Sequence, residues 1–460
     1  MTNLVDILTS DQKSDFFRCL SQESYSNLQA DILTIFEGLE EDRKPYLAFQ
    51  TISVSANFCK SIRLAAENFY ILASTYAKII GGLDPDEICD WGLPEDYVPY
   101  IMTDIALPCE MRLDIAVNPE SFESDNFELS DFKILEANSA TPGLWFETFI
   151  LNSLICKHFG QKCPNENLAE KQTADFVTYL NKISQDKFNL AKDTVYFSFP
   201  YSGQHEDILS FDARIGHFEK AGGKAKFCYT SEFVLETDPD KKQNLYSPTG
   251  ELIKYLFVHY PNEWLIEDEG EEIVLNDSIL TPNARPWDYI LQLVLDKKLV
   301  KLPPISSDII QNKGLFAFMW HGITNNYVDD DTAGMIQALI PETYCTYSEG
   351  HEAGISQIWE KPIYGREGAG VILTIDGEQI VNSNSPDIED KEWYQNMLAI
   401  FQRNCPMPHI SFDDTDVTLM FTVYLSAEGS ATGISCRASK GLGKTAINAE
   451  NGVWFPISLK

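Results

Sequence analysis

The chain has 460 residues, and 35 Lys and Arg against 69 Asp and Glu give it a formal net charge of −34. This balance argues against a nucleic-acid partner, because no run of Lys and Arg interleaved with aromatic residues could follow the phosphates. An acidic surface also repels anionic lipid, so we predict no membrane partner. An anionic substrate would need a locally positive pocket.

Hydrophobic residues make up 44% of the chain and aromatic residues 12%, enough for large buried cores. At roughly 100–200 residues per domain, the length predicts two to four domains. The first residues have neither a basic segment nor an apolar stretch, and nowhere do about 18 apolar residues run together. The sequence therefore predicts a cytoplasmic protein.

The ten cysteines occur singly, with no C-x-x-C pair and no histidine pair at metal spacing. This pattern predicts buried free thiols. A nucleophilic cysteine would need a histidine partner that the sequence cannot place.

Helical and extended patterns alternate along the first half of the chain. Apolar residues at helical spacing predict helices over residues 17–36, 58–80 and 144–185, the last interrupted at Gly160 and Pro164. Two short alternating runs, 111–117 and 132–138, predict an antiparallel hairpin joined by a turn-rich segment.

The second half contains a separate α/β unit and then a series of strands. For the α/β unit, over residues 193–300, we expect strands at 195–199 and 225–230, a helix at 208–221, a helix or loop ending in 255–264, and a solvated acidic loop at 267–272. After it we expect a helix at 313–323 and strands at 355–362, 371–375, 379–381, 397–402, 417–426, 432–437 and 453–457.

A Gly-rich segment over residues 360–370 is the first candidate for chemistry. Lys361 ends an apolar strand, and Gly365, Gly368 and Gly370 leave a loop whose backbone N–H groups can approach an anion. Arg366 lies inside that loop. These features suit a nucleotide triphosphate, which needs positive charge and donors on its phosphates. The alternative is an ordinary Gly-rich hairpin with surface charges.

The hairpin at 111–138 is the second candidate. Arg112 and Asp114 lie on one strand, and Glu136 and Asn138 on the other. Because residues i and i+2 of a strand share a face, all four can point into one space. Three oxygen-bearing side chains suit Mg²⁺, and Arg112 beside them could hold a phosphoryl oxygen. The alternative is a hairpin with charged residues on its solvated face.

Residues 438–445, Ala-Ser-Lys-Gly-Leu-Gly-Lys-Thr, resemble a phosphate-binding P-loop with Ala at the first Gly position. Such a loop must open a helix and leave room for further βα units, and residues 446–460 are too few and pattern poorly as a helix. We expect a β-hairpin or an active-site loop here instead.

Together these segments resemble the synthetase module of the glutathionylspermidine synthase family, within the ATP-grasp carboxylate–amine ligases. The motifs that carry the resemblance are Met111-Arg-Leu-Asp-Ile-Ala, Leu135-Glu-Ala-Asn-Ser-Ala-Thr-Pro followed by Glu147, Tyr260-Pro-Asn-Glu-Trp, Asn312-Lys-Gly-Leu with Trp320, Lys361-Pro-Ile-Tyr-Gly-Arg-Glu-Gly, Ile400-Phe-Gln and Thr432-Gly-Ile-Ser-Cys-Arg. They occur in the family's order from about residue 80 onward, and the Lys-Pro-x-x-Gly-Arg-x-Gly block is the specific one.

The resemblance implies an α/β (α+β) ATP-grasp fold in four parts: an N-terminal helical region (1–100), the first part of the ligase core (101–190), an inserted pre-ATP-grasp-like α/β domain (191–305) and the ATP-grasp nucleotide-binding part (306–460). It also implies ATP at Lys313, Lys361, Gly365, Gly368 and Gln402, Mg²⁺ at Asp114, Glu136 and Asn138, catalytic roles for Arg112, Arg366 and Arg437, and substrate contacts at Thr141 and Glu147.

The implied reaction is an attack of a carboxylate on the γ-phosphate of ATP, followed by displacement of phosphate by an amine. The carboxylate would belong to a peptide or small molecule, and a polyamine is one candidate for the amine. Relatives usually have Asp where Ala140 stands and an acidic tract after Arg437, so the amine need not be spermidine. The alternative is an ATP-binding protein that works as an interaction module without ligation. A P-loop NTPase is the third hypothesis.

Overall fold

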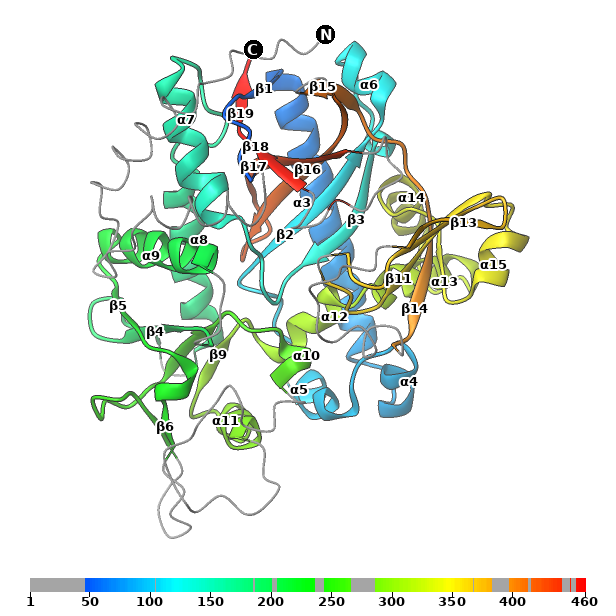
Figure 1. The fold of residues 1–460 in the computed structure, drawn as a ribbon. Helices are drawn as coiled ribbons and strands as arrows, with labels where there is room; N and C mark the ends of the chain where they lie inside the picture. The colour runs from blue at the N-terminus through cyan, green and yellow to red at the C-terminus, as the bar shows by residue number, and fades with distance from the viewer. Residues whose placement is uncertain are drawn as a thin grey trace.

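The computed structural model describes residues 46–103, 105–184, 187–200, 205–235, 244–265, 286–366, 368–382, 397–412, 415–440, 447 and 452–460. Figure 1 shows a central sheet with a second sheet at its lower left and a third at its right. The helix predicted at 17–36 and the acidic loop predicted at 267–272 lie outside the described residues.

Six antiparallel strands form the central sheet, in the order β18-β17-β16-β2-β3, with β15 paired to β16. Their bounds are β2 (Glu110–Val117), β3 (Phe132–Asn138), β15 (His409–Phe412), β16 (Thr415–Ser426), β17 (Ala431–Lys440) and β18 (Gly452–Phe455). The pairing of β2 with β3 confirms the predicted hairpin. Its connection contains a short helix, α6 (Pro119–Ser124), that the turn-rich sequence did not predict.

The long helix α3 (Ala56–Ile80) covers one face of the central sheet (Figure 1). The Ser55 hydroxyl caps its N-terminus by accepting from the backbone N–H of Phe58 at 2.8 Å, and Gly81 follows its last turn. The Phe58 ring packs on that of Phe421, with centroids 4.8 Å apart. The helix predicted at 58–80 is confirmed, and the opposite face of the sheet is left for polar residues.

The sheet at the right has the order β10-β14-β11-β12-β13. Its strands are β10 (Thr343–Tyr344), β11 (Gln357–Pro362), β12 (Ile372–Ile375), β13 (Glu378–Asn382) and β14 (Ala399–Arg403), beside α13 (Gly314–Thr324), α14 (Asp330–Leu339) and α15 (Tyr347–Glu352). The sequence predicted four of these strands and α13. It missed β10 and α15, which are too short for a period to show, and also the ten-residue α14.

The lower left sheet is parallel, with the order β5-β4-β8-β9. Its strands are β4 (Thr194–Ser198), β5 (Lys224–Phe227), β8 (Tyr255–Val258) and β9 (Val300–Leu302), and the helices of this part are α8 (Leu168–Ile183), α9 (His205–Lys220) and α11 (Pro286–Leu295). The prediction of a helix or loop over β8 was wrong. All four residues of β8 are buried, so the strand shows no alternation in sequence.

Short elements complete the fold. They are α4 (Pro85–Asp90), α5 (Val98–Thr103), a π-helix (Glu147–Leu151), α7 (Asn152–His158), α10 (Asn262–Leu265), α12 (Asp308–Gln311), β6 (Val234–Leu235), β7 (Leu245–Tyr246), and β1 (Ile52–Val54) with β19 (Ile457–Leu459). The single strand predicted at 453–457 is split at Pro456 into β18 and β19. Among the described residues, no helix is long and apolar enough to cross a membrane.

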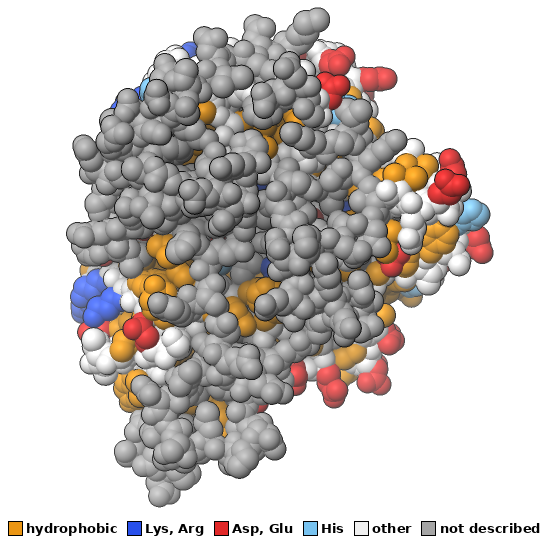
Figure 2. Space-filling view, in the orientation of Figure 1, with side chains coloured by type: hydrophobic (Ala, Val, Ile, Leu, Met, Phe, Trp, Pro, Cys, Tyr) orange, Lys and Arg blue, Asp and Glu red, His pale blue; other side chains and the backbone are white. Residues whose placement is uncertain are grey.

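Part of the acidic excess is solvated surface. Figure 2 shows acidic side chains along the right-hand edge of the molecule. Exposed carboxylates occur there on α4, at Asp86 and Glu87, and on α15, at Glu349 and Glu352. The cations discussed below are instead buried or half-buried.

Candidate active site

A polar row crosses the face of the central sheet that is turned away from α3. The strand register places Asp114 opposite Glu136 and Arg112 opposite Asn138. Arg437, on β17, reaches the same place and donates to Asp114 Oδ2 at 3.4 Å. The structure therefore brings together the four hairpin residues singled out in the sequence and one residue from near the C-terminus.

Asp114 lies at the centre of this row. Arg112 donates to both of its carboxylate oxygens, Nε to Oδ1 at 3.0 Å and Nη2 to Oδ2 at 3.2 Å. In the amide orientation that satisfies its neighbours, Asn138 donates to Glu136 at 3.2 Å and accepts from Arg112 at 3.0 Å. Burial and the nearby Arg112 lower the pKa of Arg437. Because its charged form is poorly compensated, Arg437 would gain from an added anion.

Two lysines, Lys313 buried and Lys361 half-buried, approach the same hairpin from the right-hand sheet. Lys313, at the N-terminus of α13, donates to Glu136 Oε1 at 3.3 Å and to the Gly365 carbonyl at 2.7 Å. Lys361, on β11, donates to Gln402 Oε1 on β14 at 2.7 Å. Burial lowers the pKa of Lys361 to about 8, although Glu136 opposes the shift. Burial alone would raise the pKa of Glu136, but the two lysines lower it.

The Gly-rich loop joins β11 to β12 beside Lys313. Gly368 and Gly370 have φ of 75° and 68°, in the left-handed region that favours glycine. A Cβ on Gly365 would stand 3.2 Å from two backbone carbonyl oxygens. The sequence correctly indicated a loop that only small residues can form, although Glu367 lies outside the described residues.

Arg366, in this loop, is bound by two other parts of the molecule. Its Nε and Nη2 donate to the Glu263 carboxylate at 2.5 and 3.0 Å, and its Nη1 donates to Thr141 Oγ1 at 2.7 Å. Glu263 lies in α10, shortly after β8. We assigned no role to it from the sequence, where the only signal was its place in the Tyr260-Pro-Asn-Glu-Trp motif.

A second buried network lies next to Glu263. Asn262 donates to Asp308 Oδ1 at 2.7 Å and accepts from Lys301 Nζ at 2.7 Å. Burial, and then the charge of Glu263, raise the pKa of Asp308 to about 7. Burial also lowers the pKa of Lys301 to about 8. Nothing in the sequence pattern marked Asp308 or Lys301, because each is a single charge with no charged residue beside it.

The segment after β3 is held by a hydrogen-bond acceptor on one side and by donors on the other. The Gln311 side chain accepts from the backbone N–H groups of residues 139 and 140, at 2.8 and 3.1 Å. Tyr424 Oη is within hydrogen-bonding distance of the carbonyls of Pro142 and Gly143, at 2.8 and 2.5 Å, and Arg112 Nη1 donates to Gly143 at 3.2 Å. These contacts fix the position of Thr141.

Glu147 does not lie with the lysines. It begins the π-helix, is buried, and accepts from the Tyr46 hydroxyl in an apolar cluster that includes Trp145 and Trp454. It lies near Tyr424, and its partner Tyr46 lies near Arg437.

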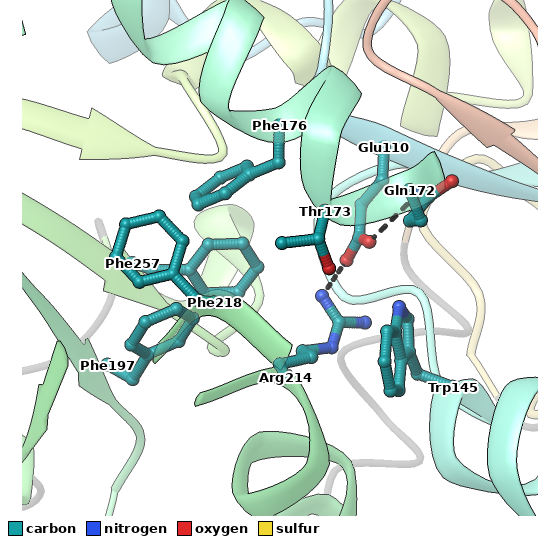
Figure 3. Close-up of a pocket in the computed structure, with 9 residues that line it drawn as sticks. All are labelled: Glu110, Trp145, Gln172, Thr173, Phe176, Phe197, Arg214, Phe218 and Phe257. Atoms are coloured by element: carbon teal, nitrogen blue, oxygen red, sulfur yellow. Dashed lines mark hydrogen bonds and ion pairs between the residues drawn. The ribbon is translucent and has the colours of Figure 1, made fainter. Parts of the chain in front are cut away.

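A small cavity of about 30 Å³ lies beside the polar row (Figure 3). Its lining residues are Glu110, Trp145, Gln172, Thr173, Phe176, Phe197, Arg214, Phe218 and Phe257. Arg214 pairs with Glu110 and lies over the Trp145 ring, 5.3 Å from its centroid. Glu110 is two residues before Arg112 on β2, so the cavity adjoins the row. Its volume is enough for about two water molecules.

The first part of the P-loop-like motif forms a regular strand. Ala438 and Ser439 pair with Val453 and Gly452 of the antiparallel β18, so the first part of the motif lies within a β-sheet. This pairing is the hairpin that we expected. The rest of the motif, residues 441–446, lies outside the described residues.

The donor set on the hairpin fits Mg²⁺. Asp114, Glu136 and Asn138 provide two carboxylates and one amide oxygen on neighbouring strand positions, which are the hard ligands that Mg²⁺ prefers. No group of three or more His, Cys, Asp and Glu that could hold a metal occurs among the described residues. A bound Mg²⁺ would therefore also need oxygens from water or a substrate.

Residues 111–446 match the protein family described as glutathionylspermidine synthase pre-ATP-grasp. No protein with a curated description matches the sequence. Among solved structures, a glutathione synthetase-like effector from Globodera pallida, in its apo form, is similar at 11% identity and a TM-score of 0.52, over 89% of each chain. A proposed gamma-glutamylcysteine synthetase from Methylobacillus flagellatus KT is similar at 11% identity and a TM-score of 0.43, over 84% of this chain and 88% of that one. The predicted ATP-grasp fold class is confirmed.

Proposed function

The chain belongs to the glutathionylspermidine synthase pre-ATP-grasp family, and we propose that it is an ATP-dependent ligase that joins a carboxylate to an amine. One observation carries the proposal. Cations from distant parts of the sequence, Arg112, which is buried, and Lys361 and Arg437, which are half-buried, converge with Lys313 on the carboxylates of one hairpin. In a chain of net charge −34, this is the locally positive site that an anionic nucleotide requires.

The proposed reaction moves negative charge between oxygens. A substrate carboxylate oxygen attacks the γ-phosphorus, the bond to the ADP oxygen breaks, and an acyl-phosphate forms. The amine nitrogen then attacks the acyl carbon, phosphate leaves, and the amine loses a proton to solvent. Neither step needs a nucleophilic side chain, but both gain from fixed positive charge at the phosphoryl oxygens.

We assign the residues to four roles according to their positions. Lys313, Lys361 and Gln402, with the backbone of Gly365 and Gly368, would hold the nucleotide, and Arg112, Arg366 and Arg437 would stabilise the transferred phosphoryl group. Mg²⁺ at Asp114, Glu136 and Asn138 would neutralise phosphate charge. Thr141, beside Arg366, and Glu147, near Tyr424, would contact the substrates.

The proposal also concerns the substrates and the cellular compartment of the reaction. A peptide or small-molecule carboxylate and an amine, with a polyamine among the candidates, fit a ligase of this family. The nine cysteines of the described residues are free, as is usual in the reducing cytoplasm. We therefore place the reaction there.

The test is product formation from a panel of peptides and amines with ATP and Mg²⁺. A productive pair should release ADP and form an amide that mass spectrometry detects. Lys361→Ala should weaken ATP binding at least about tenfold, because a buried charge contact with phosphate is lost. Lys60→Ala, on the exposed side of α3, is the matched control and should leave ATP binding unchanged. ATP binding without any amide product would instead support an ATP-binding interaction module.

A further inference from the structure

Three cysteines lie close together in the fold. Cys59 lies on α3, Cys156 on α7 and Cys163 in the segment between α7 and α8. The Asn152 side-chain nitrogen lies 3.0 Å from Cys163 Sγ and 3.7 Å from Cys156 Sγ. One amide group therefore touches both sulfur atoms.

Cys163 Sγ is surrounded by hydrogen-bond donors. Besides Asn152, the backbone N–H of Asn165 donates to it at 3.3 Å, and the Ser153 hydroxyl lies 3.3 Å away. Asn152 cannot turn aside, because its amide also pairs with the backbone of Ile457, accepting from the N–H at 2.6 Å and donating to the carbonyl at 2.9 Å. Converging donors are the environment that stabilises a thiolate.

The pKa of the Cys163 thiol agrees with this geometry. A hydrogen bond from the Cys156 thiol, followed by those from Ser153 and Asn165, lowers the pKa of Cys163 to about 6, although burial opposes the shift. The pKa of Cys156 is raised, so Cys156 keeps its proton. That proton can point to the Cys163 sulfur or to the Ile457 carbonyl, which lies 3.2 Å away.

We propose that Cys163 is a peroxide-reactive thiolate and that Cys156 is the thiol that resolves it to a disulfide. Cys163 S⁻ attacks one oxygen of hydrogen peroxide, the O–O bond breaks, hydroxide leaves, and a sulfenic acid forms. The Cys156 sulfur then attacks the sulfenic sulfur, the S–O bond breaks, and the departing hydroxide takes the Cys156 proton to leave as water. Peroxide is the two-electron oxidant: it oxidises Cys163 to the sulfenic acid, and the lone pair of the Cys156 sulfur then forms the S–S bond.

Cys345 is the internal control. It is exposed, whereas Cys163 is only half-buried, so access alone would make Cys345 the faster thiol. Its pKa is raised, by partial burial and by Glu349, and no donor set comparable to that of Cys163 surrounds it in the described residues. The thiolate fraction at neutral pH favours Cys163, and its lower intrinsic nucleophilicity offsets part of that advantage, which leaves an expected rate ratio of about ten.

The experiment treats the full chain with low hydrogen peroxide, alkylates the remaining thiols and maps each cysteine by mass spectrometry. The wild type should form a Cys156–Cys163 disulfide that dithiothreitol reverses. Cys156→Ser should instead accumulate a sulfenic acid at Cys163 that dimedone traps, and Cys163→Ser should leave Cys156 reduced. Ser153→Ala removes one donor and should slow oxidation of Cys163 severalfold, with unfolding curves to check each variant.

Faster oxidation of Cys345 than of Cys163 would overturn the proposal, as would a wild-type protein whose Cys163 stays reduced. If a variant does not fold, the map of the wild type still decides. The readout needs neither ATP nor a substrate, so it stands apart from the test of ligase activity.

Discussion

Lys361 is a half-buried cation whose charge depends on pH in the physiological range. Burial lowers its pKa to about 8, from an ordinary value near 10.5. The protonated form is the one that can hold a phosphate, so raising the pH through 8 should weaken ATP binding by the nucleotide-free protein. A bound phosphate would in turn raise the pKa, so binding should take up a proton above pH 8.

The measurement is ATP affinity by calorimetry from pH 7 to pH 9, in buffers of different ionisation enthalpy. The wild-type affinity should fall severalfold over this range. Lys361→Arg retains a charge throughout, because a guanidinium does not lose its proton in this range. Its profile should be flat by comparison. A wild-type affinity that does not change with pH would show that Lys361 does not hold the phosphates.

The position of a single residue was predictable where the two-residue period of a strand determines the face on which it lies. Arg112 and Asp114 share a face because they are two residues apart, and Glu136 follows from the hairpin register. Glu263 and Asp308 were not predictable, since their burial results from contacts across the chain. The low pKa of Cys163 also depends on tertiary contacts, with Asn152 oriented by the C-terminal β19, and no histidine is involved.

At the scale of elements, the turn between β16 and β17 must pack against α3. Gly429 lies in this turn at φ of 79°, and a Cβ there would stand 2.5 Å from Tyr70 on α3. Gly354 has φ of 80° with nothing within 4 Å of the same position. Alanine variants at these two glycines therefore distinguish the cost of backbone strain from the cost of close packing.

Gly354→Ala should destabilise the protein by about 1 kcal/mol, for the left-handed backbone alone. Gly429→Ala should cost about 1–3 kcal/mol more, because Tyr70 must move out of its contact with the turn. Urea unfolding of both variants gives the comparison. Equal losses would mean that Tyr70 moves without cost and that this turn does not fix α3 on the sheet.

Strands were predictable where polar and apolar residues alternate in the sequence. The two strands of the hairpin alternate because one face meets α3 and the other is polar, and their prediction was correct. Strand β8, with every residue buried, has no such pattern and was misassigned. The split of the last predicted strand at Pro456 follows from the missing backbone donor of proline.

For the whole molecule, Arg366 links the three largest sheets of the described residues. Its loop belongs to the right-hand sheet, Glu263 follows the parallel sheet, and Thr141 follows the central hairpin. The sequence motifs predicted the family and its fold, but the pairing of residues 103 positions apart could not be read from them.

Arg366→Ala tests whether this link holds the parts together. The pair is buried, with 14% of the Arg366 side chain and 2% of the Glu263 side chain exposed, so removing the arginine leaves a buried carboxylate unpaired beside Asp308. We expect a loss of about 3–5 kcal/mol in unfolding free energy.

The matched control is Arg403→Ala, whose pair with Glu342 is 43% and 27% exposed and should contribute under about 1 kcal/mol. Adding Glu263→Gln to Arg366→Ala removes the stranded charge and should restore part of the loss. Urea denaturation of the wild type and the three variants measures the loss of unfolding free energy in each. If Arg366→Ala lowers the unfolding free energy no more than Arg403→Ala does, the Arg366–Glu263 pair contributes no more than an exposed ion pair. The three largest sheets are then held in place by apolar packing alone.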